Sequence, residues 1–300
     1  MRTSTATVFG LLSLLRPRVL AQTYDPSKTL SIGIVLFPGF QPLDVIGPLD
    51  IIQILSGSHN MTLSMIWKEI GPVWARAPPR RTPPPANSSL PIAVYPVQAP
   101  HIVATHTFNN TPPLDILLVP GGMGNRVLHE NNDTVIEDFV AARYYSELQY
   151  LLSVCTGAAS LAKSGVLNGR HATTNKAAWA WPTQFGDGVK WEPTARWTED
   201  GNIWTSSGVS AGIDMTYAFF RALLGAAVVD PVINAMEYTP HTDRHWDPFS
   251  VVHHVPGADT SGPLGDCVGP AGYEYECPRK NTASTHTLVS PINELPLIAK

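Results

Sequence analysis

Short, almost wholly apolar runs alternate with helical segments along the chain, and this alternation constrains the fold more than any other feature. The clearest run is Leu30 to Phe37, which is rich in β-branched residues and suits a strand covered on both faces. Three further runs have the same character: Leu63 to Trp67, Leu114 to Val119 and Tyr150 to Val154. Strands that alternate with helices indicate a mostly parallel sheet with helices on both faces, so we expect an α/β fold.

Signals for helices lie between and after these runs. Pro48 precedes an apolar pattern with helical spacing, which predicts a helix beginning there. Residues 134–137 (TVIE) have the form of a capping box and predict a second helix. A third helix is expected after Cys155, ending at Gly165. The short stretch Ile70 to Trp74 is expected to continue or border the second strand.

Chemically distinctive residues follow the ends of the apolar runs. Asp44 comes after the first run, Gly121 and Gly122 come directly after the third, and Cys155 comes directly after the fourth. Parallel sheets bind their ligands at the carboxyl ends of the strands. We therefore expect these residues to share one edge of the sheet and to form the functional site.

Cys155 stands at an abrupt strand-to-helix turn with the sequence SVCTG. Such a turn exposes the corner side chain above the sheet, and small neighbours permit the strained backbone. Because a helix N-terminus favours an anion, we expect a lowered thiol pKa and a nucleophilic thiolate. The alternative is a structural cysteine packed as a small hydrophobe. The position favours a nucleophile, since a cysteine followed by Thr-Gly at a strand end is poorly placed for the core.

A thiolate that attacks an unsaturated carbon needs partners for charge and protons. The backbone N–H groups of Thr156 and Gly122 are candidate donors to the developing charge. The alternative interpretation of Gly121-Gly122 is an ordinary loop after a strand. Asp44 is the candidate acid/base, because a carboxylate beside a thiolate has a raised pKa and can shuttle a proton. A helix-capping role explains Asp44 equally well on local sequence alone.

Four strings of this chain resemble motifs of the ThiJ/PfpI superfamily in order and spacing, over residues 30 to about 255: LFPGFQPLDVIGP, LDILLVPGG, SVCTGAASLAKSGVLNGRHATT and TSSGVSAGIDM. The chain is most similar to the isocyanide hydratase branch, which carries Asp in a Leu-Asp-x-x-Gly-Pro motif and Cys-Thr-Gly at the elbow. The resemblance implies a flavodoxin-like three-layer sandwich, a homodimer and no cofactor. It also implies that Cys155 attacks an isocyanide carbon to give a thioimidate. Asp44 would then manage protons and position the water that releases an N-substituted formamide.

The chain departs from the superfamily pattern at several places. Relatives called intracellular peptidases have His directly after the elbow cysteine, where this chain has Thr156, so a Cys-His peptidase is unsupported. Many relatives have His where Asn175 follows Ala-Thr-Thr, which changes a residue of the expected pocket wall. The Pro-rich stretch 76–97 and the tail from about 257 are additions to the compact fold. Because that tail lacks helical periodicity, it does not supply the helix-turn-helix pair of the regulator relatives.

The N-terminal segment has the pattern of a secretory signal. An apolar run from Ala6 to Leu15 follows Arg2, and Val19-Leu20-Ala21 offers a small-x-small cleavage site before Gln22. We therefore expect a signal peptide over 1–21, a catalytic domain over 28–256, and a Pro/Gly-rich extension over 257–300. A disordered leader is the alternative reading of the first segment.

Glycosylation acceptors and cysteine usage agree with secretion. Four Asn-x-Ser/Thr triplets begin at Asn60, Asn87, Asn109 and Asn132. Of the three cysteines, Cys267 and Cys277 flank a short Gly/Pro-rich segment and are expected to close a disulfide loop in an oxidising compartment, which leaves Cys155 free.

Charge and residue clustering argue against two other classes of function. The formal net charge is −4 and no Lys/Arg run is present, which disfavours nucleic-acid binding. After signal cleavage no membrane association is expected. The cluster His241, Asp243, His245, Asp247 and His253-His254 resembles a metal site in composition, but it lacks helical phase and is interrupted by prolines, so we expect a solvated loop near the pocket and no metal.

Three further residues have less specific interpretations. Asp214 is explained as a capping or first-turn charge at the start of an apolar helix. Trp179 and Trp181 are assigned either to the pocket or to the core.

Two other functions compete with isocyanide hydration. A glyoxalase-like activity on small dicarbonyls needs the same thiolate and differs in its substrate. A secreted binding or redox-sensing protein would use an oxidisable Cys155 without turnover.

Overall fold

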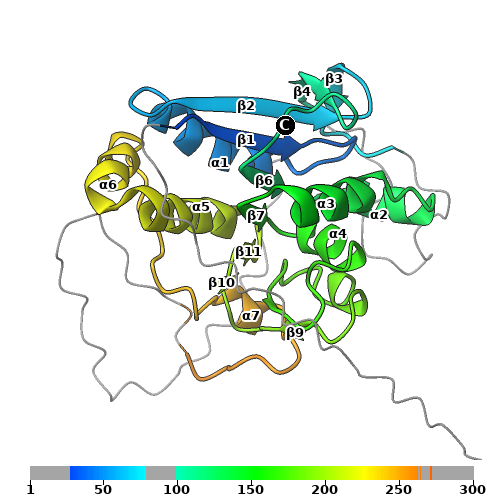
Figure 1. Ribbon diagram of the computed structural model, residues 1–300. Coiled ribbons are helices and arrows are strands. Elements are labelled where there is room, and N and C mark those ends of the chain that lie inside the picture. The colour runs from blue at the N-terminus through cyan, green and yellow to red at the C-terminus, as the bar shows by residue number, and fades with distance from the viewer. Residues whose placement is uncertain (1–27, 79–98, 263, 265–270, 272–300) are drawn as a thin grey trace, which may run out of the picture.

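A seven-stranded sheet forms the centre of the computed structural model, which describes residues 28–78, 99–262, 264 and 271. The strand order is β10-β11-β7-β6-β1-β2-β5 (Figure 1). The strands are β1 (Leu30–Val35), β2 (Met61–Trp67), β5 (His106–Thr107), β6 (Ile116–Val119), β7 (Tyr150–Ser153), β10 (Trp197–Asp200) and β11 (Ile203–Ser206). All pairings are parallel except that of the edge strand β10 with β11. The predicted mostly parallel sheet is confirmed.

Helices cover both faces of this sheet. On one face lie α1 (Pro42–Leu55), α5 (Val209–Leu224) and α6 (Ala226–Ala235), which pack against one another. On the other lie α2 (Met123–Glu130), α3 (Val135–Ser146) and α4 (Gly157–Lys163) (Figure 1). The short elements are β3 (Gly71–Trp74), β4 (His101–Ala104), β8 (His171–Ala172), β9 (Lys190–Trp191), η1 (Pro182–Gln184) and α7 (Phe249–Val252). The result is the expected three-layer α/β sandwich.

The apolar runs become the core because the sheet is covered on both faces. In β6 every residue is buried, and in β1 only Ser31 is partly exposed. Ser31 is also the position where the strand is fixed to its neighbour, since its backbone N–H and its hydroxyl both donate to Asp115 Oδ2 at 2.8 Å. Strands buried on both faces read as continuous hydrophobic runs, which is why the sequence predicted them well.

The first helix begins earlier than predicted. The sequence predicted a helix that begins at Pro48. In the structure the helix begins at Pro42, and Pro48 lies in its interior. Pro42 suits the first turn, where a backbone N–H has no partner to lose, and the helix tolerates the missing donor of Pro48. The correction matters because it places Asp44 in the first turn of α1, with a fixed position relative to the sheet.

Two local predictions were wrong in detail. The helix predicted from TVIE is present as α3, with Thr134 at the N-cap, but the Thr134 hydroxyl donates to Asp138 Oδ2 at 2.9 Å and makes no capping bond. Glu137 is instead paired with Lys163 of α4 at 2.6 Å. Ile70 to Trp74 does not extend β2, because β3 pairs antiparallel with β4 in a separate two-stranded sheet. Within the described ranges, no helix combines the length and apolar character needed to cross a membrane.

Candidate active site

The Cys155 backbone is held in the left-handed region, with φ of 58°. Its N–H donates to the carbonyl oxygens of Ser206 (3.2 Å) and Ser207 (2.9 Å), at the end of β11. Its own carbonyl oxygen accepts a hydrogen bond from the Thr174 hydroxyl at 2.9 Å. A non-glycine residue keeps such a conformation only where its surroundings enforce it. The predicted sharp turn between β7 and α4 is therefore present, and bonds from two other segments hold it.

Glycines allow the segments around this turn to approach closely. A Cβ atom on Gly121 would lie 2.5 Å from the Thr156 backbone nitrogen and 2.9 Å from Cys155 Cβ. A Cβ atom on Gly157 would collide with the carbonyl oxygen of Val119. The loop after β6 and the turn after β7 thus lie in direct backbone contact, which brings the Gly-Gly pair beside Cys155 as predicted.

Asp44 reaches the same place from α1 and is fully buried. Its Oδ2 accepts a hydrogen bond from the Gly121 N–H at 2.9 Å. Its Oδ1 has no hydrogen-bond partner among the described residues. Burial raises the pKa of Asp44 to about 7, against the lowering effects of the Gly121 N–H and of a contact with the Cys155 thiol. The carboxyl is therefore poised to exchange a proton near neutral pH, and it does not cap its own helix.

The predicted lowering of the Cys155 pKa is wrong. The side chain is only 6% exposed, and burial raises the pKa of the thiol above its ordinary value. The negative charge of Asp44 raises this pKa further, while the Thr156 N–H and the Asn175 side chain oppose the change. Because the two acids share one buried site, their protons belong to the pair. At rest the thiol holds its proton, and Asp44 is the group placed to accept it.

Thr156 and Gly122 both lie at the site, but they are hydrogen-bonded to each other. The Gly122 N–H donates to Thr156 Oγ1 at 2.9 Å, and that hydroxyl donates to Asn125 Oδ1 at 3.0 Å. The Gly122 N–H is thus already engaged, and it would have to exchange partners before it could bind a developing negative charge. The Thr156 N–H is directed at the thiol and remains suitable as a donor there.

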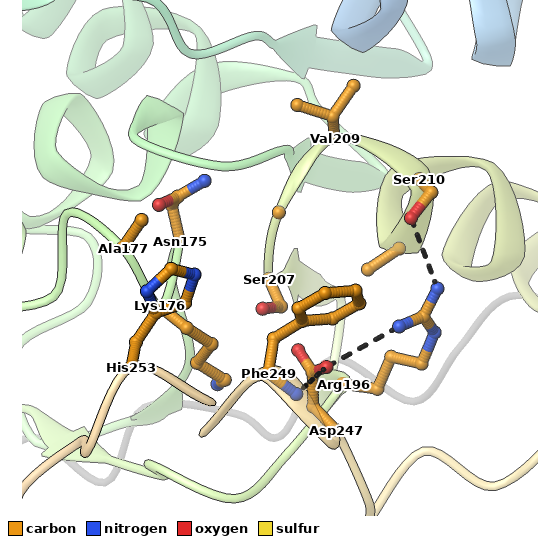
Figure 2. Close-up of a pocket in the computed structure, with 12 residues that line it drawn as sticks. Asn175, Lys176, Ala177, Arg196, Ser207, Val209, Ser210, Asp247, Phe249 and His253 are labelled. Atoms are coloured by element: carbon orange, nitrogen blue, oxygen red, sulfur yellow. Dashed lines mark hydrogen bonds and ion pairs between the residues drawn. The ribbon is translucent and has the colours of Figure 1, made fainter. Parts of the chain in front are cut away.

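A pocket of about 170 Å³ is lined by Asn175 and by residues of the segments around Arg196, Ser207 and Asp247 (Figure 2). Cys155 is not among its lining residues, and Asn175 links the pocket to the elbow, because its side chain also hydrogen-bonds the Cys155 thiol. Polar lining groups include Lys176, Arg196, Ser207, Asp247 and His253, while Ala177, Val209, Ala211 and Phe249 supply apolar surface. Pockets for drug-sized ligands are larger, so this volume suits a small molecule or one substituent of a substrate.

A curated relative matches most of this chain. Isonitrile hydratase from Pseudomonas putida is 33% identical over 215 residues, which cover 70% of this chain and 79% of that protein. A family model described as the DJ-1/PfpI family matches residues 92–222, which contain the Gly-Gly pair, Cys155 and Ser207. The chain belongs to the DJ-1/PfpI family.

Solved structures of DJ-1/PfpI proteins share the fold. A ThiJ/PfpI family protein from Pseudomonas syringae aligns with a TM-score of 0.57 at 24% identity, over 77% of this chain and 85% of that one. Drosophila melanogaster DJ-1beta aligns with a TM-score of 0.53 at 15% identity, over 70% of this chain and 99% of that one. At these identities the likeness concerns the fold, and it confirms the fold expected from the sequence.

This DJ-1/PfpI chain has functional-site features that its sequence did not reveal. Arg196 is buried at the pocket and pairs with Asp214 (2.6 Å) and with Asp247 (3.5 Å). Asp214 is therefore an internal ion-pair partner, and the interpretation as a first-turn charge was wrong. Lys176 is buried beside them, and burial lowers its pKa to about 7. Asp214 stands in the TSSGVSAGIDM motif, but its pairing could not be predicted, because charged groups from separate segments meet only in the folded chain.

Part of the His/Asp cluster lies at the pocket. Among the described residues, no group of three or more His, Cys, Asp or Glu side chains is arranged to hold a metal ion. Asp247 and His253 line the pocket, in agreement with a loop near it. Asp247, however, is buried and not solvated. Trp179 and Trp181 are both partly buried and lie outside the pocket lining.

The remaining predicted sites concern the surface and the chain ends. Asn60, Asn109 and Asn132 are exposed, so their glycosylation stays a prediction that the fold permits. Asn87, the signal segment 1–21 and the proposed Cys267–Cys277 pair lie outside the described residues.

Proposed function

We propose that this protein is an isonitrile hydratase-type enzyme, which adds water to an isocyanide and gives an N-substituted formamide. The observation that carries the proposal is the buried contact between the Cys155 thiol and the Asp44 carboxyl. A thiol in a left-handed elbow supplies the nucleophile, and a carboxyl with a pKa of about 7 supplies a proton carrier. The similarity to the Pseudomonas putida isonitrile hydratase supplies the substrate class.

The first half of the reaction forms a covalent adduct. Asp44, as the carboxylate, accepts the thiol proton, and the Cys155 sulfur attacks the terminal carbon of the isocyanide. The carbon–sulfur bond forms while one carbon–nitrogen π bond becomes a nitrogen lone pair. Protonated Asp44 returns its proton to the former isocyanide carbon. The product is a thioimidate that holds the substituent on nitrogen and one hydrogen on carbon.

The second half releases the product with water as co-reactant. Water attacks the thioimidate carbon, and Asp44 accepts a proton from the water and delivers one to the nitrogen. The tetrahedral adduct then loses its hydroxyl proton, forms the formamide carbonyl and breaks the carbon–sulfur bond. Sulfur regains a proton, so the thiol and the carboxylate are restored. The buried Oδ1 of Asp44 has no partner among the described residues, which suits these transfers.

The test is a turnover assay with purified protein and a small isocyanide such as cyclohexyl isocyanide. Loss of the isocyanide infrared band with matching release of the formamide is expected for the wild type. Cys155→Ala is expected to abolish both signals, and intact-mass detection of a trapped adduct should be lost with them. Absence of turnover by the wild type, or full activity in Cys155→Ala, would contradict the proposal. Lactate formation from methylglyoxal without isocyanide turnover would establish the glyoxalase-like alternative instead.

A further inference from the structure

Ser207 carries a hydroxyl that the mechanism above does not use. The residue is 1% exposed and follows β11, directly before the Gly208 N-cap of α5. Its carbonyl oxygen accepts the Cys155 N–H at 2.9 Å, so the residue is fixed relative to the elbow. Ser207 is one of the residues that line the pocket, and its buried Oγ has no hydrogen-bond partner among the described residues. Figure 2 shows the Ser207 side chain in the middle of the lining residues.

A buried hydroxyl without a partner is costly, which calls for an explanation. Other donors of the site and the pocket already have partners. The Thr156 N–H and the Asn175 side chain are directed at the sulfur itself. The Gly121 N–H donates to Asp44, the Gly122 N–H donates to Thr156, and Lys176 Nζ donates to Thr173 Oγ1 and the Ala195 carbonyl, each at 2.7 Å. Ser207 is thus a pocket residue with a donor to offer.

The proposed reaction creates an acceptor that was absent from the substrate. In an isocyanide the nitrogen is triply bonded to carbon and has no lone pair for a hydrogen bond. Attack by sulfur turns it into an imine-type nitrogen with a basic lone pair. An interaction made only after attack begins lowers the barrier without strengthening substrate binding.

Resting on the proposed function, we propose that Ser207 is a further catalytic residue, whose hydroxyl donates a hydrogen bond to the substrate nitrogen as the thioimidate forms. The pocket beside it then holds the substituent on that nitrogen. No proton is transferred in this contact. The hydroxyl stabilises the lone pair in place, and Asp44 remains the group that moves protons.

The test compares Ser207→Ala with a matched control, Ser153→Ala. Ser153 also has a buried hydroxyl without a described partner, but it lies on β7 outside the pocket lining. Ser207→Ala is expected to lower kcat about tenfold or more with KM changed less than about twofold, as expected for loss of one hydrogen bond made only in the transition state. Ser153→Ala is expected to keep the wild-type kcat. Equal kcat in Ser207→Ala and wild type would overturn the inference.

A substituent series gives a readout that a merely structural role would not move. With para-substituted phenyl isocyanides, electron-donating groups make the thioimidate nitrogen more basic and the hydrogen bond stronger. The decrease in kcat caused by Ser207→Ala is therefore expected to become larger as the substituent donates more electron density. A constant decrease across the series would contradict a hydrogen bond from Ser207 to the nitrogen. If Ser207→Ala does not fold, Ser207→Cys is the second variant, because it keeps the shape of the side chain with a weaker donor. Its kcat is expected to decrease less than that of Ser207→Ala, and a kcat equal to that of the wild type would contradict the inference.

These outcomes separate the inference from the function on which it rests. Wild-type protein that leaves every isocyanide unconsumed overturns both. Wild-type turnover that is lost in Cys155→Ala but retained in Ser207→Ala overturns only the role of Ser207.

Discussion

The Asp44 carboxyl lies against the Cys155 thiol, and its negative charge raises the pKa of that thiol. Asp44 lies on α1 and Cys155 lies in the turn after β7. The Gly121 N–H donates to Asp44 Oδ2 at 2.9 Å and holds the carboxyl in place. The pair is therefore built to keep the thiol protonated until a substrate arrives and then to remove the proton. This arrangement differs from a permanently ionised cysteine, which would be open to oxidation at all times.

Asp44→Asn is expected to separate reactivity from catalysis. Loss of the proton carrier should lower kcat/KM by about 100-fold or more, as is usual for a general acid/base. The same change removes the charge that raises the thiol pKa, so iodoacetamide should modify Cys155 at lower pH than in the wild type. Asp50→Asn, an exposed position of the same helix, is the control and should leave both unchanged. Wild-type turnover in Asp44→Asn, or a shift of the alkylation profile to higher pH, would refute the pairing.

Asp44 should also make stability depend on pH. Its pKa is about 7 in the folded protein and near 3.8 when unfolded, so between these values the folded state holds an extra proton. The free energy of unfolding should therefore fall as pH rises through this window and level off above about 7. The decline attributable to this group is at most on the order of 4 kcal/mol. Urea unfolding of wild type and Asp44→Asn at several pH values checks this, and parallel curves for the two proteins would contradict it.

The sequence predicted the site best where a residue's position follows directly from the local backbone, such as a turn between a strand and a helix. Cys155 was identified from the strand-to-helix turn alone, and the ends of parallel strands correctly brought Gly121 and Asp44 toward it. Its thiol pKa was predicted with the wrong sign, because the helix N-terminus is visible in the sequence but burial is not. Ser207 was missed for a related reason. Its missing hydrogen-bond partner is a property of the packed structure, and no spacing of residues encodes it.

Lys176 should contribute a pH dependence of the opposite sign. Burial lowers its pKa to about 7, although Asp247 and Glu192 oppose this and only Arg196 adds to it. Between about pH 7 and 10 the unfolded chain binds the extra proton, so this group makes the folded state more stable as pH rises. The contribution approaches roughly 1.4 kcal/mol per pH unit within that window. The difference in unfolding free energy between wild type and Lys176→Met should therefore grow from pH 7 to 8.5; a constant difference would exclude a buried neutral lysine.

The buried ion pair of Arg196 should be among the more sensitive positions of the fold. Arg196→Met strands two buried carboxylates, Asp214 and Asp247, and is expected to cost about 3–5 kcal/mol of unfolding free energy. Asp214→Asn should cost less, because Arg196 keeps Asp247 and the Asn side chain can still accept from Tyr238. Urea unfolding at pH 7 measures both. A larger loss in Asp214→Asn than in Arg196→Met would reverse this assignment of roles.

Gly121 should tolerate no side chain, because three atoms of the elbow occupy the space. An added Cβ would lie 2.5 Å from the Thr156 nitrogen, 2.6 Å from Thr156 Oγ1 and 2.9 Å from Cys155 Cβ. The backbone nitrogen cannot move aside as a flexible side chain would, so Gly121→Ala should displace the loop, weaken the bond to Asp44 and cost about 1–3 kcal/mol through overpacking. Activity should fall by more than the stability loss explains, since the thiol and carboxyl separate.

Gly57→Ala, at an exposed helix end, is the control and should retain wild-type turnover. Comparison of kcat/KM and thermal midpoint in the two variants tests the claim, and an active Gly121→Ala enzyme would show that the elbow needs no such close approach.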